Sequence, residues 1–231
     1  MLIKLYSQRN YGAELLLDDL LGYCDDVESD VAGACNALKG WDRRQNIDSR
    51  GAQVWTEFWR NARKIDGLYR VPFDVKNPVN TPRGIALGDE AVKESVYQAL
   101  KTAQKTLEEA GIGLDSPWGD VQFAERNGQR IPIPGGQGWA GMFSMIKADL
   151  VKGKGYTPII HGNSYIQVIS WDKEGQLDAK GILTYSQSQE ADSPHYSDQT
   201  ELYSQGKWLS FPFTEKEITS DPNLTVVRLT E

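Results

Sequence analysis

Three residue types that form hydrolase triads lie close together near the C-terminal end of the chain. Ser193, His195 and Asp198 occur in the run Asp-Ser-Pro-His-Tyr-Ser-Asp, which begins at Asp192. In a triad the histidine must reach the serine hydroxyl while the carboxylate orients the histidine, and residues on one short loop rarely achieve this. We therefore interpret Asp192 or Ser193 as turn-forming residues and expect His195 to fold against a neighbouring sheet.

A second motif of chemical interest is the glycine-rich run from Gly136 to Gly141, which matches the G-x-G-x-x-G pattern of dinucleotide sites. That pattern binds a pyrophosphate only between a strand and a helix of a βαβ unit. No βαβ pattern surrounds it here, so a turn beside a sheet is the favoured interpretation. The second histidine, His161, is expected to hydrogen-bond locally at a sheet end. The sequence therefore predicts no cofactor.

The two cysteines, Cys24 and Cys35, are separated by ten residues that include several acids and Gly33. A helix end, a turn and the next helix start would fit this segment and could bring the two thiols within disulfide range. From the spacing alone, a disulfide and a pair of buried reduced thiols are equally open. A metal site is disfavoured, because both histidines are far away in the sequence.

The composition excludes several function classes. The 231-residue chain has a net charge of −7, whereas phosphate binding needs a basic face, so nucleic acid is not an expected partner. No apolar run is long enough to cross a bilayer, and no membrane association is expected. The first six residues lack the apolar core of a signal peptide, which taken literally predicts a cytoplasmic protein if Met1 is the natural start.

Apolar periodicity predicts helices in the first half of the chain. Leucines repeat at helical spacing from Leu16 to Leu21, and a short helix over residues 32–38 should end at Gly40. A third helix, with an apolar stripe from Val54 to Ala62, could be capped by Asp48 or Ser49. The fourth should begin after the acids at 89–90 and stop at Gly111. Residues 66–88, with three prolines, are expected to form a long irregular loop.

After residue 111 the pattern changes to strands. Residues 121–124 and 130–133 flank an Asn-Gly pair at 127–128, which predicts a hairpin. Residues 164–171 alternate polar and apolar side chains, and residues 179–185 should pair with them across a turn at 172–175. A final strand is expected over 223–229. We predict an α+β fold with a helical domain over residues 1–112 and an antiparallel β segment over residues 113–231.

Several stretches together resemble the penicillin acylase family, most closely the C-terminal part of the β chain in its acyl-homoserine lactone acylase branch. They occur in the family's order and span nearly the whole chain. The stretches are residues 10–21 running into Cys24, residues 35–44 followed by 48–52, residues 162–168, residues 181–188, residues 193–199, and Trp208 with residues 212–214.

The resemblance implies an N-terminal nucleophile hydrolase. In this family a precursor cuts itself into α and β chains, and the serine that then begins the β chain attacks an amide carbonyl with its own α-amine as base. Here the first residue is Met1, and no glycine is followed by Ser, Thr or Cys, so the usual cleavage junction is absent. The resemblance therefore implies no catalytic residue in this chain, and we expect the isolated chain to hydrolyse no amide.

The same resemblance implies a location and partners. Family members are typically exported to the periplasm, which favours a Cys24–Cys35 disulfide and places the signal peptide in a part outside this chain. The partners would be the α chain and the N-terminal part of the β chain, which the β segment would join to complete an αββα core.

The resemblance also implies an activity: the parent would cleave the acyl chain from N-acyl homoserine lactones, with a quorum-quenching effect. The alternatives are a piece of a penicillin or cephalosporin acylase, and a non-catalytic binding or structural module. An isolated piece with an exposed apolar face would be prone to self-association.

Overall fold

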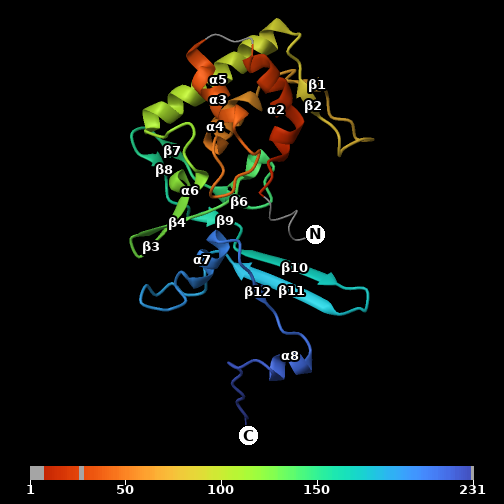
Figure 1. Cartoon of the computed structure of the whole chain (residues 1–231), viewed down its shortest axis with the longest axis vertical. Coiled ribbons are helices and arrows are strands. Elements are labelled where there is room, and N and C mark those ends of the chain that lie inside the picture. The colour runs from red at the N-terminus through yellow and green to blue at the C-terminus, as the bar shows by residue number, and fades with distance from the viewer. Residues whose placement is uncertain (1–7, 26–28, 230–231) are drawn as a thin grey trace. The chain divides into compact units, whose positions relative to one another are not determined.

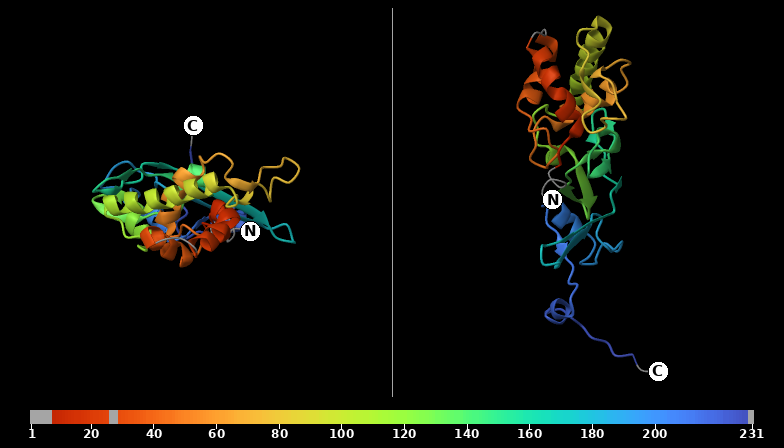
Figure 2. Two further views of the ribbon diagram at one scale, coloured as in Figure 1. Left: turned by 90° about the horizontal axis from the view of Figure 1, so that it is seen from above. Right: turned by 90° about the vertical axis from the view of Figure 1, so that its right-hand side faces the viewer.

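The computed structural model describes residues 8–25 and 29–229 and has an α+β architecture, as predicted (Figure 1). It divides into two compact units, the first ending at Asn163 and the second beginning at Ser164. In the first unit, the helices gather at one end and most of the short strands lie at the other (Figures 1 and 2). No helix in the described part of the chain is long and apolar enough to cross a membrane.

Four helices form the core of the first unit, and each buries the apolar stripe that its sequence predicts. Leu16, Leu17 and Leu20 are buried on the first helix, and Trp55 and Phe58 are fully buried on the third. The indoles of Trp41 and Trp59 stack on Trp55 with ring centroids 5.7 and 5.9 Å away. The helices are α2 (Tyr11–Cys24), α3 (Ala32–Lys39), α4 (Ala52–Ala62) and α5 (Glu90–Ala110), with a 3-10 turn η1 (Ser29–Val31) before α3.

The long helix α5 has both ends that the sequence predicts. The Asp89 side chain accepts hydrogen bonds from the backbone N–H groups of Ala91 and Val92. Gly111 ends the helix with φ of 76°, a left-handed conformation that glycine adopts without a steric penalty. The helix packs along α4, so its buried stripe closes the core of the first unit.

The predicted cap of α4 is wrong. Neither Asp48 nor Ser49 precedes the helix directly; the N-cap is Gly51, with φ of 88°. A Cβ atom here would lie 2.6 Å from the carbonyl oxygen of Ala37 in α3, so no side chain fits between the two helices. Ser49 instead accepts a hydrogen bond from the backbone N–H of Asn46. Close packing of α4 on α3 therefore overrides the usual preference for a capping side chain.

The prediction that residues 66–88 form an irregular loop is only partly correct. The segment contains a small two-stranded ribbon. Strands β1 (Tyr69–Val71) and β2 (Arg83–Ile85) pair antiparallel. Asp19 of α2 accepts a hydrogen bond from the backbone N–H of Ile85 and forms an ion pair with Arg70 at 3.2 Å. A carboxylate far away in the sequence thus fixes the ribbon, which a local pattern could not reveal.

The remaining strands of the first unit form three small sheets. The predicted hairpin at the Asn-Gly pair is confirmed, with φ of 49° at Asn127 and 72° at Gly128 between the strands. The glycine-rich run from Gly136 forms a short strand and a 3-10 turn without a βαβ unit, as predicted. The elements are α6 (Trp118–Val121), β3 (Phe123–Arg126), β4 (Gln129–Pro132), β5 (Gly136–Gln137), η2 (Gly138–Ala140), β6 (Met145–Lys147), β7 (Leu150–Val151), β8 (Gly155–Tyr156) and β9 (His161–Gly162).

Residues 113–163 pack with the helices. The side-chain amide of Gln53 on α4 donates to the carbonyl groups of Gly113, Leu114 and Ser116. The division into compact units consequently falls after Asn163. The boundary expected between residues 112 and 113 marks where helices give way to strands, and it differs from this division.

The second unit contains the predicted long hairpin. Strand β10 (Tyr165–Trp171) pairs with β11 (Leu177–Leu183) in a register that sets Ile169 opposite Ala179, and β12 (Leu209–Ser210) adds to the outer edge of β11. Two short helices, α7 (Asp198–Ser204) and α8 (Glu215–Thr219), complete this unit. The strand expected over residues 223–229 is wrong: these residues pair with no strand, and Val226 and Leu229 are 80% and 90% exposed.

Candidate functional site

The residues of the apparent triad do not form one. His195 is exposed rather than folded against a sheet, which corrects our expectation, and its Nδ1 lies 2.8 Å from Oδ2 of Asp198. Ser193 forms a turn as predicted, because its hydroxyl accepts a hydrogen bond from the backbone N–H of His195. Although partial burial acts to raise it, hydrogen bonds from His195 and Gln199 hold the pKa of Asp198 below its usual value. The serine hydroxyl is thus bound to backbone and not to the imidazole.

Hydrogen bonds join two stretches in the second unit that resemble the acylases, residues 181–188 and 193–199. The carbonyl group of His195 accepts hydrogen bonds from the backbone N–H groups of Gln187 and Ser188. Ser186, which has φ of 62°, accepts from the backbone N–H groups of Gln199 and Thr200 with its hydroxyl. The polar side chains of these motifs therefore satisfy backbone groups.

Hydrogen bonds also join the first two stretches that resemble the acylases, residues 10–21 and residues 35–44. The buried side chain of Asn10 caps α2 by accepting from Ala13, accepts from the indole of Trp55 and donates to Gln45. The backbone N–H of Asn10 donates to the carbonyl group of Arg43 at 2.9 Å. Because one asparagine joins α2, α4 and the turn between α3 and α4, the motif around Asn10 has a structural role in this chain.

The Cys24–Cys35 pair forms a disulfide, with Cα atoms 5.7 Å apart. It joins the end of α2 to α3, and both cysteines are buried. Within the described residues, no group of three or more histidine, cysteine, aspartate or glutamate side chains could hold a metal ion. The other histidine, His161, lies exposed in β9 beside an open hollow of about 690 Å³ that Lys147 and Ile160 also line.

A buried charged cluster, which the sequence did not reveal, connects α4 to β8. Glu57 is 3% exposed and accepts a hydrogen bond from the hydroxyl of Tyr156 at 2.7 Å and one from Arg60 at 2.8 Å. Arg60 and Arg63 both lie over the ring of Trp139, 5.1 and 5.0 Å from its centroid. Burial, reinforced by the charge of Glu57, raises the pKa of Tyr156 well above its ordinary value. Tyr156 is therefore a protonated hydrogen-bond donor at neutral pH and not a base.

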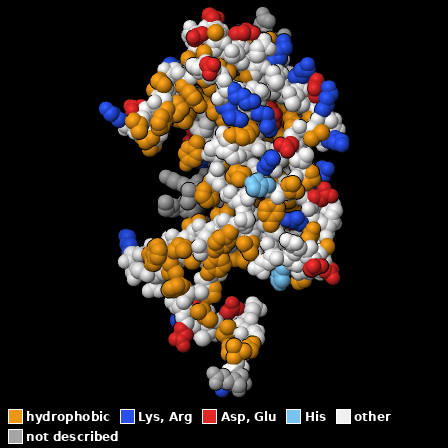
Figure 3. Space-filling view, turned by 180° about the vertical axis from the view of Figure 1, so that it is seen from behind, with side chains coloured by type: hydrophobic (Ala, Val, Ile, Leu, Met, Phe, Trp, Pro, Cys, Tyr) orange, Lys and Arg blue, Asp and Glu red, His pale blue; other side chains and the backbone are white. Residues whose placement is uncertain are grey.

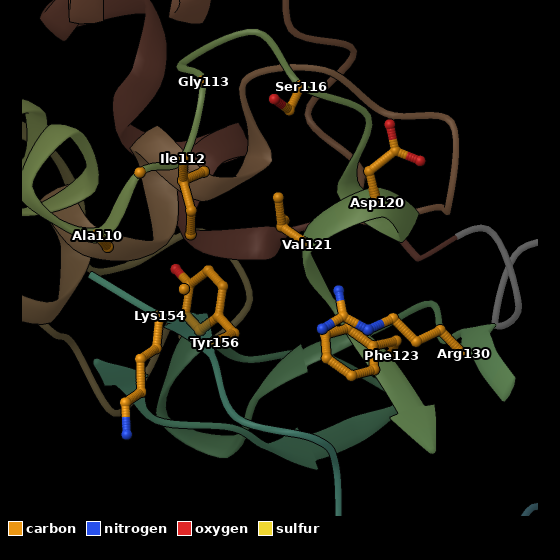
Figure 4. Close-up of a pocket in the computed structure, with 12 residues that line it drawn as sticks. Ala110, Ile112, Gly113, Ser116, Asp120, Val121, Phe123, Arg130, Lys154 and Tyr156 are labelled. Atoms are coloured by element: carbon orange, nitrogen blue, oxygen red, sulfur yellow. The ribbon is translucent and has the colours of Figure 1, made fainter. Parts of the chain in front are cut away.

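A pocket of about 260 Å³ opens between the C-terminal end of α5, the β3–β4 hairpin and β8 (Figure 4). Its walls include the buried side chains of Ile112, Phe123 and Tyr156. Arg130 lies across the ring of Phe123, with the guanidinium carbon 4.1 Å from the centroid. The arrangement offers a cavity of mixed lining, with apolar side chains on one wall, polar groups around them, a fixed cation at one side and no nucleophile–base pair.

Apolar side chains are also exposed outside this pocket. They gather on the loop between β1 and β2, at the upper left of Figure 3, and on the β10–β11 hairpin, at its lower left. On the loop Phe73 and Val75 are 62% and 78% exposed, and on the hairpin Trp171 is 66% exposed. Exposed apolar groups of this size mark surfaces that other polypeptide covers in many proteins.

Comparison with known proteins gives the chain its family. The penicillin amidase family profile matches residues 3–220. The chain is 35% identical over 227 residues to an acyl-homoserine lactone acylase PvdQ of Pseudomonas syringae pv. syringae, covering 96% of this chain and 29% of that protein. It is 34% identical to the PvdQ acylase of Pseudomonas putida over 222 residues, with 96% and 28% covered.

A relative with a different name matches equally well. The chain is 34% identical over 237 residues to the aculeacin-A acylase of Actinoplanes utahensis, covering 98% of this chain and 29% of that protein. The chain thus spans less than a third of the length of these curated relatives. Since the family profile covers almost all of the sequence, the chain belongs to the penicillin amidase family.

Proposed function

We propose that this chain is the C-terminal part of the β chain of an acylase that cleaves the acyl chain from N-acyl homoserine lactones. The observation that supports this most is the 35% identity to acyl-homoserine lactone acylases over 96% of the chain. The hydrogen bonds of Asn10 and Ser186 support it further, because they connect the stretches that resemble the acylases to one another or to the neighbouring helix. Hydrolysis of such signals would give the parent a quorum-quenching effect.

In the proposed mechanism the nucleophile is a serine at the start of the β chain, outside the sequence described here. Its α-amine, with an ordinary pKa of about 8, is suited to act as base near neutral pH. This chain would supply no group to that chemistry. Its part would be structural, since the polar clusters around Asn10, Glu57 and Ser186 are engaged in internal hydrogen bonds.

The proposed partner is the rest of the acylase, which would cover the outer face of β10 and complete an αββα core. Tyr165, Ile169 and Trp171 alternate along that face and are 50%, 45% and 66% exposed. Such a row of apolar side chains favours burial against another sheet or helix. Without that cover the isolated chain should self-associate.

This proposal about the partner has a direct test in sedimentation velocity of the isolated chain over a range of concentrations. We expect concentration-dependent association that becomes several-fold weaker in the Ile169→Ser/Trp171→Ser variant. Gln167→Ser, on the same face of the same strand, is the matched control and should change nothing. A chain that stays monomeric at all concentrations would contradict an uncovered docking face.

We also propose a periplasmic location for the parent. The Cys24–Cys35 disulfide supports it, because disulfides persist in oxidising compartments and are rare in the cytosol. Fractionation of the source cells, with detection by an antibody against this chain, tests the proposal. Recovery of the protein only in the cytosolic fraction would reject it.

The activity itself is tested on the complete gene product. We expect release of homoserine lactone from long-chain N-acyl homoserine lactones and no hydrolysis by the purified 231-residue chain. The match to aculeacin-A acylase supports a second candidate substrate, aculeacin A, so both are assayed beside penicillin G. Turnover of penicillin G alone would reject the lactone assignment, and amide hydrolysis by the isolated chain would reject its structural role.

A further inference from the structure

The pocket at the end of α5 has the shape of a small-ligand site. It is an open pocket of about 260 Å³, and its apolar wall is formed by Ile112, Val121, Phe123 and Tyr156. Ile112, Phe123 and Tyr156 are 7%, 5% and 5% exposed, so the walls are fixed by the core of the first unit. The Tyr156 hydroxyl is bound to Glu57 and leaves only its ring to the pocket. This apolar wall suits the body of a small molecule, while glycine backbone, Ser116 and charged side chains line the rest of the pocket.

The charged group of the pocket is Arg130. Its guanidinium is stacked on Phe123, which reduces the conformational entropy that a flexible cation would lose on binding. Arg130 lies opposite Glu125 in the hairpin register, and within residues 8–25 and 29–229 its guanidinium stacks on Phe123 without an ion pair to Glu125. A guanidinium held in this way is available for a bidentate pair with a carboxylate.

The other charged residues of the pocket wall do not occupy the space in front of the Arg130 guanidinium. In Figure 4 the carboxylate of Asp120 and the ammonium group of Lys154 both point away from the space in front of Arg130. At the opposite side of the pocket, Gly111 ends α5, where the helix dipole disfavours an anion. The electrostatic potential of Arg130 and of the α5 dipole therefore orients a ligand with its anionic group at Arg130 and its apolar body toward Ile112.

We propose that this pocket binds a small organic carboxylate, with the carboxylate on Arg130 and a compact aromatic or short aliphatic body against Ile112, Val121 and Tyr156. The site lies wholly within the first unit and does not depend on the proposed acylase function. Its volume limits the ligand to about the size of a single ring with one substituent.

The test uses the 231-residue chain with benzoate, and with benzyl alcohol as an uncharged analogue, by ligand-observed NMR and calorimetry. Benzoate should bind and benzyl alcohol should bind at least about tenfold more weakly, since a charge-assisted hydrogen bond is lost. Arg130→Gln should weaken benzoate binding by about tenfold or more, and added salt should weaken it too. Lys154→Gln is the matched control and should change the dissociation constant by less than about twofold.

A second variant tests the cavity rather than the charge. Val121→Phe fills the space and should abolish binding while Arg130 remains. If that variant does not fold, the exposed Arg130→Gln variant still decides, because its side chain lies outside the core. The proposal is overturned if benzoate does not bind at millimolar concentration, if benzyl alcohol binds equally well, or if Arg130→Gln binds benzoate like the wild type.

Discussion

Removal of a single hydroxyl tests the buried cluster around Glu57. In Tyr156→Phe the ring remains, with its edge contact to Trp118 at a centroid distance of 5.6 Å. Glu57 would keep Arg60 and lose the hydrogen bond that joins α4 to β8. Because a hydrogen bond to a buried charged group contributes about 1.5–3 kcal/mol, we expect the free energy of unfolding to fall by that amount at pH 7.

The same variant makes a prediction about alkaline pH. Burial raises the pKa of Tyr156 in the folded chain, while in the unfolded chain it should be near 10. Above pH 10 the unfolded state therefore binds fewer protons, and wild-type stability falls by roughly 1.4 kcal/mol per pH unit through this residue alone. Phenylalanine has no such proton, so the stability difference between wild type and variant is constant below pH 9 and shrinks as pH rises through 10.

Urea unfolding followed by near-ultraviolet circular dichroism, at pH 7, 9 and 10.5, measures both effects. The exposed Tyr11→Phe variant is the control and should differ from wild type by less than about 0.5 kcal/mol at pH 7. A loss below about 0.5 kcal/mol for Tyr156→Phe at pH 7 would refute the stabilising role of the hydrogen bond. A stability difference that is the same at pH 10.5 as at pH 7 would refute the argument from burial.

Three further groups of substitutions test the helical part of the first unit. Cys24→Ser/Cys35→Ser should lower the free energy of unfolding by about 3 kcal/mol, from the loop entropy of an 11-residue separation, and an unchanged urea midpoint would contradict this. Gly51→Ala should destabilise by more than about 1 kcal/mol, because its Cβ would meet the carbonyl oxygen of Ala37, whereas Gly22→Ala in open space should stabilise by about 0.5–1 kcal/mol; equal effects would show that close packing is not the cause. Asp89→Ala should cost about 1 kcal/mol through the lost cap of α5, measured by thermal unfolding, and Asp89→Asn should retain most of the stability.

Local patterns predicted the elements that local physics determines. The stripe and both ends of α5 follow from residues within the helix, and the Asn127–Gly128 turn follows from the left-handed conformations that this pair adopts readily. The cap of α4 was missed because the decisive contact is with Ala37 in another helix. The strand expected over residues 223–229 was wrong because alternation alone supplies no partner for pairing.

The candidate sites show the same division between local and distant causes. The turn formed by Ser193 was predicted from the residue types, but the exposure of His195 depends on how α7 meets the preceding loop. Neither the Glu57 cluster nor the pocket beside Arg130 has a local signature, since each joins residues of separate elements. Glu57 in the sequence looks like any acid on an amphipathic helix.

The sequence separation of 99 between Glu57 and Tyr156 has a consequence for the order of events during synthesis. At about 5–20 residues per second, Glu57 is translated roughly 5–20 s before its hydroxyl partner. Throughout that interval the Glu57 carboxylate has Arg60 of its own helix as a partner but lacks the Tyr156 hydroxyl. Completion of β8 thus supplies the last hydrogen bond to this buried acid, and a chain released before Tyr156 would lack it.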